Sequence, residues 1–126
     1  MRIPRPQHPF HHEPWGDLRA RFHELAAVRG ELRPLADIVD SVVELGASND
    51  LAGSRFGDDL VVAAAPIPEP PYDVVRIYAP DADHESLSIE QFTEYGPPHR
   101  VELPAAQAVP VFWRFVAETF AIRPHP

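Results

Sequence analysis

The sequence contains no cysteine and no lysine. Without cysteine, the chain forms no disulfide, has no thiolate nucleophile and cannot bind zinc through sulfur. Without lysine, it lacks the amine of Schiff-base enzymes and the lysine of a phosphate-binding P-loop. Composition alone therefore excludes several classes of enzyme.

The sequence also has little that would bring it to a membrane or to nucleic acid. No apolar run approaches the ~18 residues of a membrane span, and Arg2 and Arg5 are not followed by the apolar stretch of a signal peptide. The formal charge is −8, with 19 acidic residues against 11 arginines, whereas a nucleic-acid-binding protein presents a basic patch. We expect a cytoplasmic protein that binds neither a membrane nor nucleic acid.

The length of 126 residues suits one domain with a core that needs no disulfide or structural metal. Residues 1–14 hold four prolines and three histidines. Because proline lacks the backbone N–H and blocks a helix, we predict an extended arm over residues 1–14. Residues 15–126 are predicted to form a single α+β domain.

Three segments show helical periodicity. Apolar side chains recur at 3-4-3 spacing between residues 15 and 30. A second apolar stripe follows between residues 34 and 46, with polar side chains, Ser41 among them, facing away. The short connection predicts an antiparallel helical hairpin. A third, more hydrophobic helix is predicted from about Pro110, since proline suits the first helical turn.

The middle of the chain has the patterns of β-strands. Residues 60–65 form a short apolar run, with residues 54–56 as a candidate hairpin partner, and residues 74–79, 87–94 and 99–103 alternate. Tight connectors rather than helices separate these segments, which favours an antiparallel sheet. The predicted class is α+β, with an N-terminal helical hairpin, a small antiparallel sheet of three to five strands and a hydrophobic C-terminal helix packed on the sheet.

Two clusters have the residue types of metal sites, and neither fits one well. His8, His11 and His12 lie on the proline-rich arm, which supplies no rigid ligand shell. Residues 81–85 carry three acids and a histidine, but a calcium loop would need glycine at Ser86 and glutamate at Phe92. We expect no metal and no cofactor; a metal on the arm, or a cation or arginine bound at residues 81–85, is the alternative.

No catalytic residue is identified. None of the five serines lies in a Gly-x-Ser-x-Gly turn, and the glycines do not form a dinucleotide-binding fingerprint. His23 or His84 would act as a base only if folding brought a carboxylate to it. The enzyme alternative is a pocket between the sheet and the C-terminal helix, with Tyr78, Asp83 and His84 as its polar members.

The predicted C-terminal helix is apolar on most sides, with Phe112, Trp113 and Phe115 pointing in different directions. One face of a sheet cannot cover such a helix, so either the helical hairpin or a second subunit must cover the rest. Because large aromatic side chains are enriched at binding hot spots, a homodimer through Phe112, Trp113 and Phe115 is one of the two alternatives.

The negative charge is concentrated in one third of the chain. Residues 58–102 hold ten acidic residues and two arginines, a net charge of −8, together with the three tyrosines. Such a surface attracts a basic partner, because charge complementarity speeds association and sets orientation. The alternative is that the acids only keep the protein soluble. The predicted partner-binding residues are Asp58, Asp59, Asp73, Tyr78, Asp81, Asp83, Glu85, Glu90, Glu94 and Tyr95.

These observations lead to one functional hypothesis and two rivals. We expect a small bacterial protein-binding module without enzymatic activity, of the inhibitor or immunity type, that binds a basic toxin or nuclease. The rivals are a dimeric secretion chaperone and a small enzyme or ligand-binding domain. The inhibitor ranks first because the acids are gathered in one part of the chain.

Overall fold

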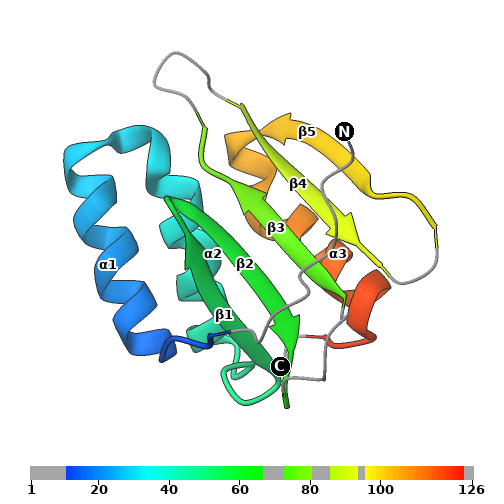
Figure 1. Cartoon of the computed structure of the whole chain (residues 1–126). Coiled ribbons are helices and arrows are strands. Elements are labelled where there is room, and N and C mark those ends of the chain that lie inside the picture. The colour runs from blue at the N-terminus through cyan, green and yellow to red at the C-terminus, as the bar shows by residue number, and fades with distance from the viewer. Residues whose placement is uncertain (1–10, 67–72, 81–85, 94–95, 124–126) are drawn as a thin grey trace.

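The computed structural model describes residues 11–66, 73–80, 86–93 and 96–123. Within these residues, a helical pair precedes a sheet and a third helix follows it (Figure 1). This arrangement confirms the predicted α+β class. The elements are α1 (Trp15–Val28), α2 (Arg33–Glu44), β1 (Leu51–Phe56), β2 (Asp59–Ala64), β3 (Val74–Tyr78), β4 (Ser86–Phe92), β5 (His99–Pro104) and α3 (Ala108–Phe120), with single 3-10 turns at Gly30–Leu32 and Ala105–Gln107.

The sheet is an antiparallel meander. Its five strands are neighbours in the order in which they occur in the chain. The β1–β2 hairpin turns at Gly57, whose φ of 62° lies in the left-handed region that favours glycine. Pairing across the centre brings Val62 opposite Val75, and Ile89 lies opposite Val101. Each strand therefore lies beside its neighbours in sequence, which fixes which side chains meet.

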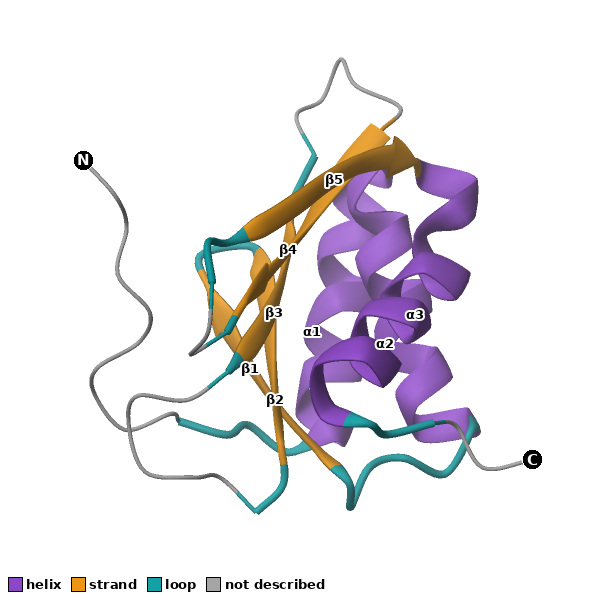
Figure 2. Ribbon diagram, turned by 90° about the vertical axis from the view of Figure 1, so that its right-hand side faces the viewer, coloured by secondary structure: helices purple, strands orange, loops and turns teal. Residues whose placement is uncertain are grey.

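All three helices lie on one face of the sheet (Figure 2). The main core lies between these two layers, and its fully buried side chains include Phe22, Ile38 and Phe112. A smaller cluster of Ala63, Val74 and Phe92 is buried apart from this core. The fold therefore has one helical layer and one sheet layer.

The aromatic side chains of α3 are buried within the subunit. Phe112 is 0% exposed, Phe115 2% and Trp113 8%. The C-terminal helix, α3, packs against α2 as well as against β3 and β4. Of the two alternatives that the sequence left open, it is the helical hairpin that covers this helix. These three side chains therefore have almost no surface left for the predicted homodimer, because α2 covers what the sheet does not.

Ser41 does not face solvent as its pattern predicted. Its hydroxyl donates to the carbonyl oxygen of Ile38 at 2.6 Å and accepts a hydrogen bond at 3.0 Å from the indole N–H of Trp113. Ser41 is thus a buried polar contact between α2 and α3. A buried indole N–H needs such an acceptor, which explains a serine on the buried side of α2.

Residues just before α1 cover the outer edge of β1. The backbone N–H of Glu13 donates to the carbonyl oxygen of Gly53 at 2.9 Å, and the carboxylate of Glu13 accepts from the backbone N–H of Arg55 at 3.1 Å. The ring nitrogen Nδ1 of His12 accepts from the N–H of Gly53 at 3.0 Å. Of the predicted arm, residues 1–10 lie outside the described residues.

Replacing Gly53 by alanine should lower the free energy of unfolding by about 1–3 kcal/mol, the usual cost of overpacking a core. A Cβ at this position would lie 2.7 Å from Cη2 of Trp15 and 2.8 Å from Cδ1 of Leu18. Chemical denaturation measures the change.

Gly16→Ala is the matched control, because nothing lies within 4 Å of a Cβ at this position in the first turn of α1. Its stability should stay unchanged or rise by up to about 1 kcal/mol. Equal stabilities for the two variants would contradict tight packing of α1 on β1.

Candidate functional site

The face of the sheet opposite the helices carries the candidate site. Along β3, Val75 and Ile77 are buried in the main core. Because successive side chains of a strand alternate, Arg76 and Tyr78 point to the opposite face. Pairing places Arg76 beside Glu90 of β4. Polar and aromatic side chains from neighbouring strands therefore meet at this end of β3.

Four side chains form an alternating aromatic and cationic stack across the sheet, which we call the ladder: Phe56, Arg76, Tyr78 and Arg100. The guanidinium carbon of Arg76 lies 4.7 Å from the centroid of the Phe56 ring and 4.6 Å from that of Tyr78. The guanidinium carbon of Arg100 lies 4.3 Å from the Tyr78 centroid. Each such contact is worth about 0.5–2 kcal/mol, more where water is excluded. The ladder joins β1, β3 and β5.

Carboxylates from β2 and β4 hold the ladder in place. Asp59 accepts hydrogen bonds from Nε and Nη2 of Arg76 at 2.9 and 2.5 Å, and another from the backbone N–H of Ala79 at 2.6 Å. The side chains of Arg76 and Asp59 are only 21% and 15% exposed. A sheltered pair with two hydrogen bonds fixes a side chain better than an exposed ion pair does. Arg76 therefore has one defined position.

Tyr78 is held by a carboxylate as well as by two arginines. Its hydroxyl donates to Oε1 of Glu90 at 2.5 Å. Burial is the largest cause that raises the pKa of Tyr78, to about 12, and the hydrogen bond to Glu90 acts in the same direction. The positive charges of Arg76 and Arg100 oppose this rise without cancelling it. The phenol therefore stays neutral and acts as a hydrogen-bond donor.

The ladder ends in exposed side chains. Phe56 is 65% exposed, although it is a large apolar residue, and Arg100 is exposed at the other end. Beside Tyr78 and Arg100 is a shallow pocket of about 210 Å³, whose polar lining includes Ser86, Ser88 and Glu102. A pocket of this size admits a single side chain rather than a large substrate, because ligand pockets are usually about 300–1,000 Å³.

The structure brings together some of the predicted partner-binding residues and separates others. Asp59, Tyr78 and Glu90 meet at the ladder, as described above. Asp58 instead lies beside the end of α1, where it accepts from Arg29 at 2.6 Å. Asp73 precedes the first residue of β3, whereas Tyr78 is its last. The predicted residues Asp81, Asp83, Glu85, Glu94 and Tyr95 lie outside the described residues.

The acids of the described face are not an unbroken negative surface. Asp59 is paired with Arg76, and Glu90 with the hydroxyl of Tyr78. The two arginines of the acidic segment both lie in the ladder, beside carboxylates. The described part of this face is therefore a mixture of charges with aromatic rings between them.

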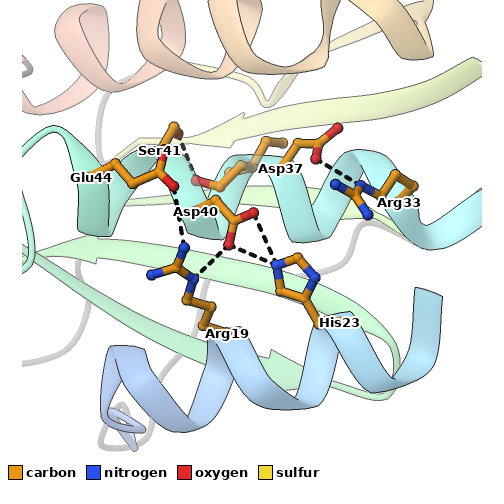
Figure 3. Close-up of polar contacts among 8 residues, drawn as sticks. Arg19, His23, Arg33, Asp37, Asp40, Ser41 and Glu44 are labelled. Carbon is orange, nitrogen blue, oxygen red and sulfur yellow. Dashed lines mark hydrogen bonds and ion pairs between the residues drawn. The ribbon is translucent and has the colours of Figure 1, made fainter. Parts of the chain in front are cut away.

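His23 does have a carboxylate beside it, between α1 and α2 (Figure 3). Its Nε2 lies 2.8 Å from Oδ1 of Asp40, and Nε of Arg19 donates to the same oxygen at 2.8 Å. Glu44 accepts from Nη2 of Arg19 at 3.2 Å. Ser41, next to Asp40 in sequence, makes its contacts with α3 and Ile38 instead. The cluster thus links the two helices, and its serine is not placed to be activated by His23.

Phe56, Arg76 and Arg100 were missed as site residues. The alternation of Arg76 with Val75 and Ile77 already placed it on the same face as Tyr78. The sequence did not show which strands pair, and this pairing brings Phe56 beside Arg76 and Arg100 beside Tyr78. The available signal was that Arg76 and Arg100 are the two basic residues within 58–102.

Comparisons of the chain with protein-family models, with curated proteins and with solved structures give no match. Within the described residues, no helix has the length and apolar character to cross a membrane. The same residues contain no group of three or more histidine, cysteine, aspartate or glutamate side chains able to hold a metal ion. The functional argument therefore rests on the geometry of the ladder.

Arg76→Lys should lower the free energy of unfolding by about 1–2 kcal/mol, since lysine has neither the planar stacking surface nor the paired donors of arginine. Chemical denaturation checks this. In the matched control Arg33→Lys, the pair with Asp37 at 3.0 Å is exposed on both sides, so the change should stay within about 0.5 kcal/mol. Similar losses in both variants would show that the ladder adds nothing to stability.

Tyr78 should ionise at higher pH in the folded protein than in the unfolded chain. Its pKa of about 12 exceeds the ordinary value of about 10 in an unfolded chain. The unfolded chain therefore loses this proton first, so the stability contribution is complete below pH ~10 and is lost as the pH rises to ~12. Ultraviolet titration of tyrosinate should show a late step that Tyr78→Phe removes.

Glu90→Gln should move this late step to lower pH, because it removes the carboxylate that favours the neutral phenol. The step should not return fully to the ordinary value, since burial is the larger cause. If the step that Tyr78→Phe removes lay near the ordinary tyrosine value, this account of Tyr78 would be contradicted.

Proposed function

We propose that this chain is a cytoplasmic protein-binding module of the inhibitor or immunity type, without enzymatic activity, and that it binds a basic protein such as a toxin or nuclease. The binding surface is the ladder with its flanking carboxylates. The observation that carries the proposal is the exposed Phe56 at the end of an ordered arginine–aromatic stack, on a sheet face that no described helix covers.

The chemistry of the ladder suits a protein partner. Tyrosine and arginine are enriched among the residues that dominate interface energies. Arg76 and Tyr78 are already held by Asp59 and Glu90, so they lose little conformational freedom when a partner binds. A surface whose arginine and tyrosine side chains are already held in place, with a small pocket beside them, supports recognition of another folded protein.

The charge distribution supports a basic partner. Residues 58–102, which contain β2 to β5 up to Glu102, have a net charge of −8 in sequence. Three of these acids, Asp81, Asp83 and Glu85, belong to the sequence that connects β3 to β4. The long-range field of this segment attracts a positive protein, and the ladder then supplies close contacts.

The rival functions receive less support from the described residues. The enzyme hypothesis expected a pocket between the sheet and the C-terminal helix. Core side chains such as Phe112 and Phe115 fill this space. The small pocket described above lies beside Tyr78 and Arg100, on the other face of the sheet. A secretion chaperone that dimerises through α3 would need aromatic side chains that are buried in the subunit.

Affinity capture from extracts of the source organism tests the proposal. The wild-type chain should retain a basic protein at about 50 mM salt and release it at about 500 mM, because salt screens attraction between charged surfaces. Phe56→Ala should weaken retention about tenfold or more, as expected for an aromatic hot spot.

The control variant is Val28→Ala, which also removes an exposed apolar side chain, 84% exposed, but on α1. It should leave retention unchanged. Capture of no basic protein at low salt, or equal retention by both variants, would overturn the proposed function.

A further inference from the structure

The two edge strands of the sheet, β1 and β5, differ in the hydrogen bonds that the described residues make to their outer sides. The outer edge of β1 is hydrogen-bonded by residues 12 and 13, as shown above. β5 is the last strand at the opposite edge and pairs only with β4. In the described residues, no segment is hydrogen-bonded to its outer side. An unpaired edge strand is a template for another strand.

Prolines limit the length of β5 that can pair. Pro98 precedes the strand and Pro104 ends it, each three residues from Val101. Because proline has no N–H to donate, an added strand can pair only with residues 99–103. The longest two-fold symmetric pair that two copies of this window can form is therefore centred on Val101.

The charges of β5 favour one register of such a pair. Arg100 and Glu102 lie on the ladder face on either side of Val101, as their contacts with Tyr78 and Ser86 show. With Val101 opposite itself, Arg100 of each copy lies opposite Glu102 of the other. Registers centred on Arg100 or Glu102 would place like charges directly opposite each other, which is destabilising.

Arg100 makes no ion pair with a carboxylate among the described residues of its own subunit, although Glu90 lies opposite it on β4. Its guanidinium stacks on the Tyr78 ring, whereas Arg76 in the same ladder is paired with Asp59. Glu102 accepts from the hydroxyl of Ser86 at 3.1 Å and lines the shallow pocket with Arg100. A second copy would therefore complete the exposed end of the ladder.

We propose that two copies of this chain pair antiparallel through β5, centred on Val101, so that Glu102 of each copy completes the ladder of the other at Arg100. The two sheets become one continuous sheet with all helices on the same face. The ladders then lie side by side on the opposite face. The dimer is argued from β5 alone, so it does not depend on the proposed function.

The test measures oligomeric state by sedimentation equilibrium from about 5 to about 300 µM, a range in which a weak dimer changes its population by mass action. The wild-type mass should rise towards that of two copies. Arg100→Glu and Glu102→Arg should each raise the dissociation constant about tenfold or more, because each variant places like charges opposite each other at both symmetric contacts.

Mixing restores the opposite charges. When Arg100→Glu and Glu102→Arg are combined, each cross-strand contact pairs a glutamate with an arginine, so the mixture should form a heterodimer that neither variant forms alone. The double variant should dimerise like the wild type. Circular dichroism melts at low concentration check that each variant is folded. If one single variant is less stable, the mixture still tests whether opposite charges restore the dimer.

Arg114→Glu and Glu118→Arg are the matched controls, because they make the same charge changes at exposed positions of α3. Both should dimerise like the wild type. A wild-type chain that stays monomeric throughout the range would overturn the β5 dimer, as would a dimer that the Arg100 and Glu102 variants leave unchanged. Neither result would bear on the capture of a basic partner.

Discussion

Burial of α3 between α2 and the sheet is the contact on which the rest of the structure depends. Phe112 and Val116 are fully buried there, and the indole of Trp113 reaches Ser41 of α2. A helix that is apolar on most sides must be enclosed on more than one side. Because α2 and the sheet together enclose it, all three helices gather on one face, and the other face has to be stabilised by its own side chains.

On that other face, Arg76 connects three strands through its side-chain contacts. It joins Phe56 of β1 to Tyr78 of β3 by stacking, and it is anchored by Asp59 of β2. The guanidinium can do both because its faces stack on rings while its edge donates hydrogen bonds. The same arrangement that stabilises the sheet leaves the outer side of Phe56 available, so stability and the proposed binding function share residues.

Much of the fold was predictable because it follows from local patterns. The helical hairpin, the alternating strands and the C-terminal helix occur close to their predicted positions, and α3 begins at Ala108 rather than Pro110. Ser41 was predicted to face solvent because serine is a polar residue. It is buried instead, since its hydroxyl accepts a hydrogen bond from Trp113, 72 residues away in the chain. The site was only partly predictable: Asp59 and Glu90 were named for their charge and Tyr78 as a tyrosine of the acidic segment, but Arg76 and Arg100 were not named.

The sequence by itself determined which segments are helices and strands, and that Arg76 and Tyr78 share one face of β3. Backbone geometry makes side chains alternate along a strand, so this needs no knowledge of other strands. Only the tertiary structure decided that Phe56 and Arg100 flank them, and that Asp59 neutralises Arg76. Those contacts depend on the register of four successive strand pairs, and a one-residue change of register moves the side chains of a strand to the opposite face.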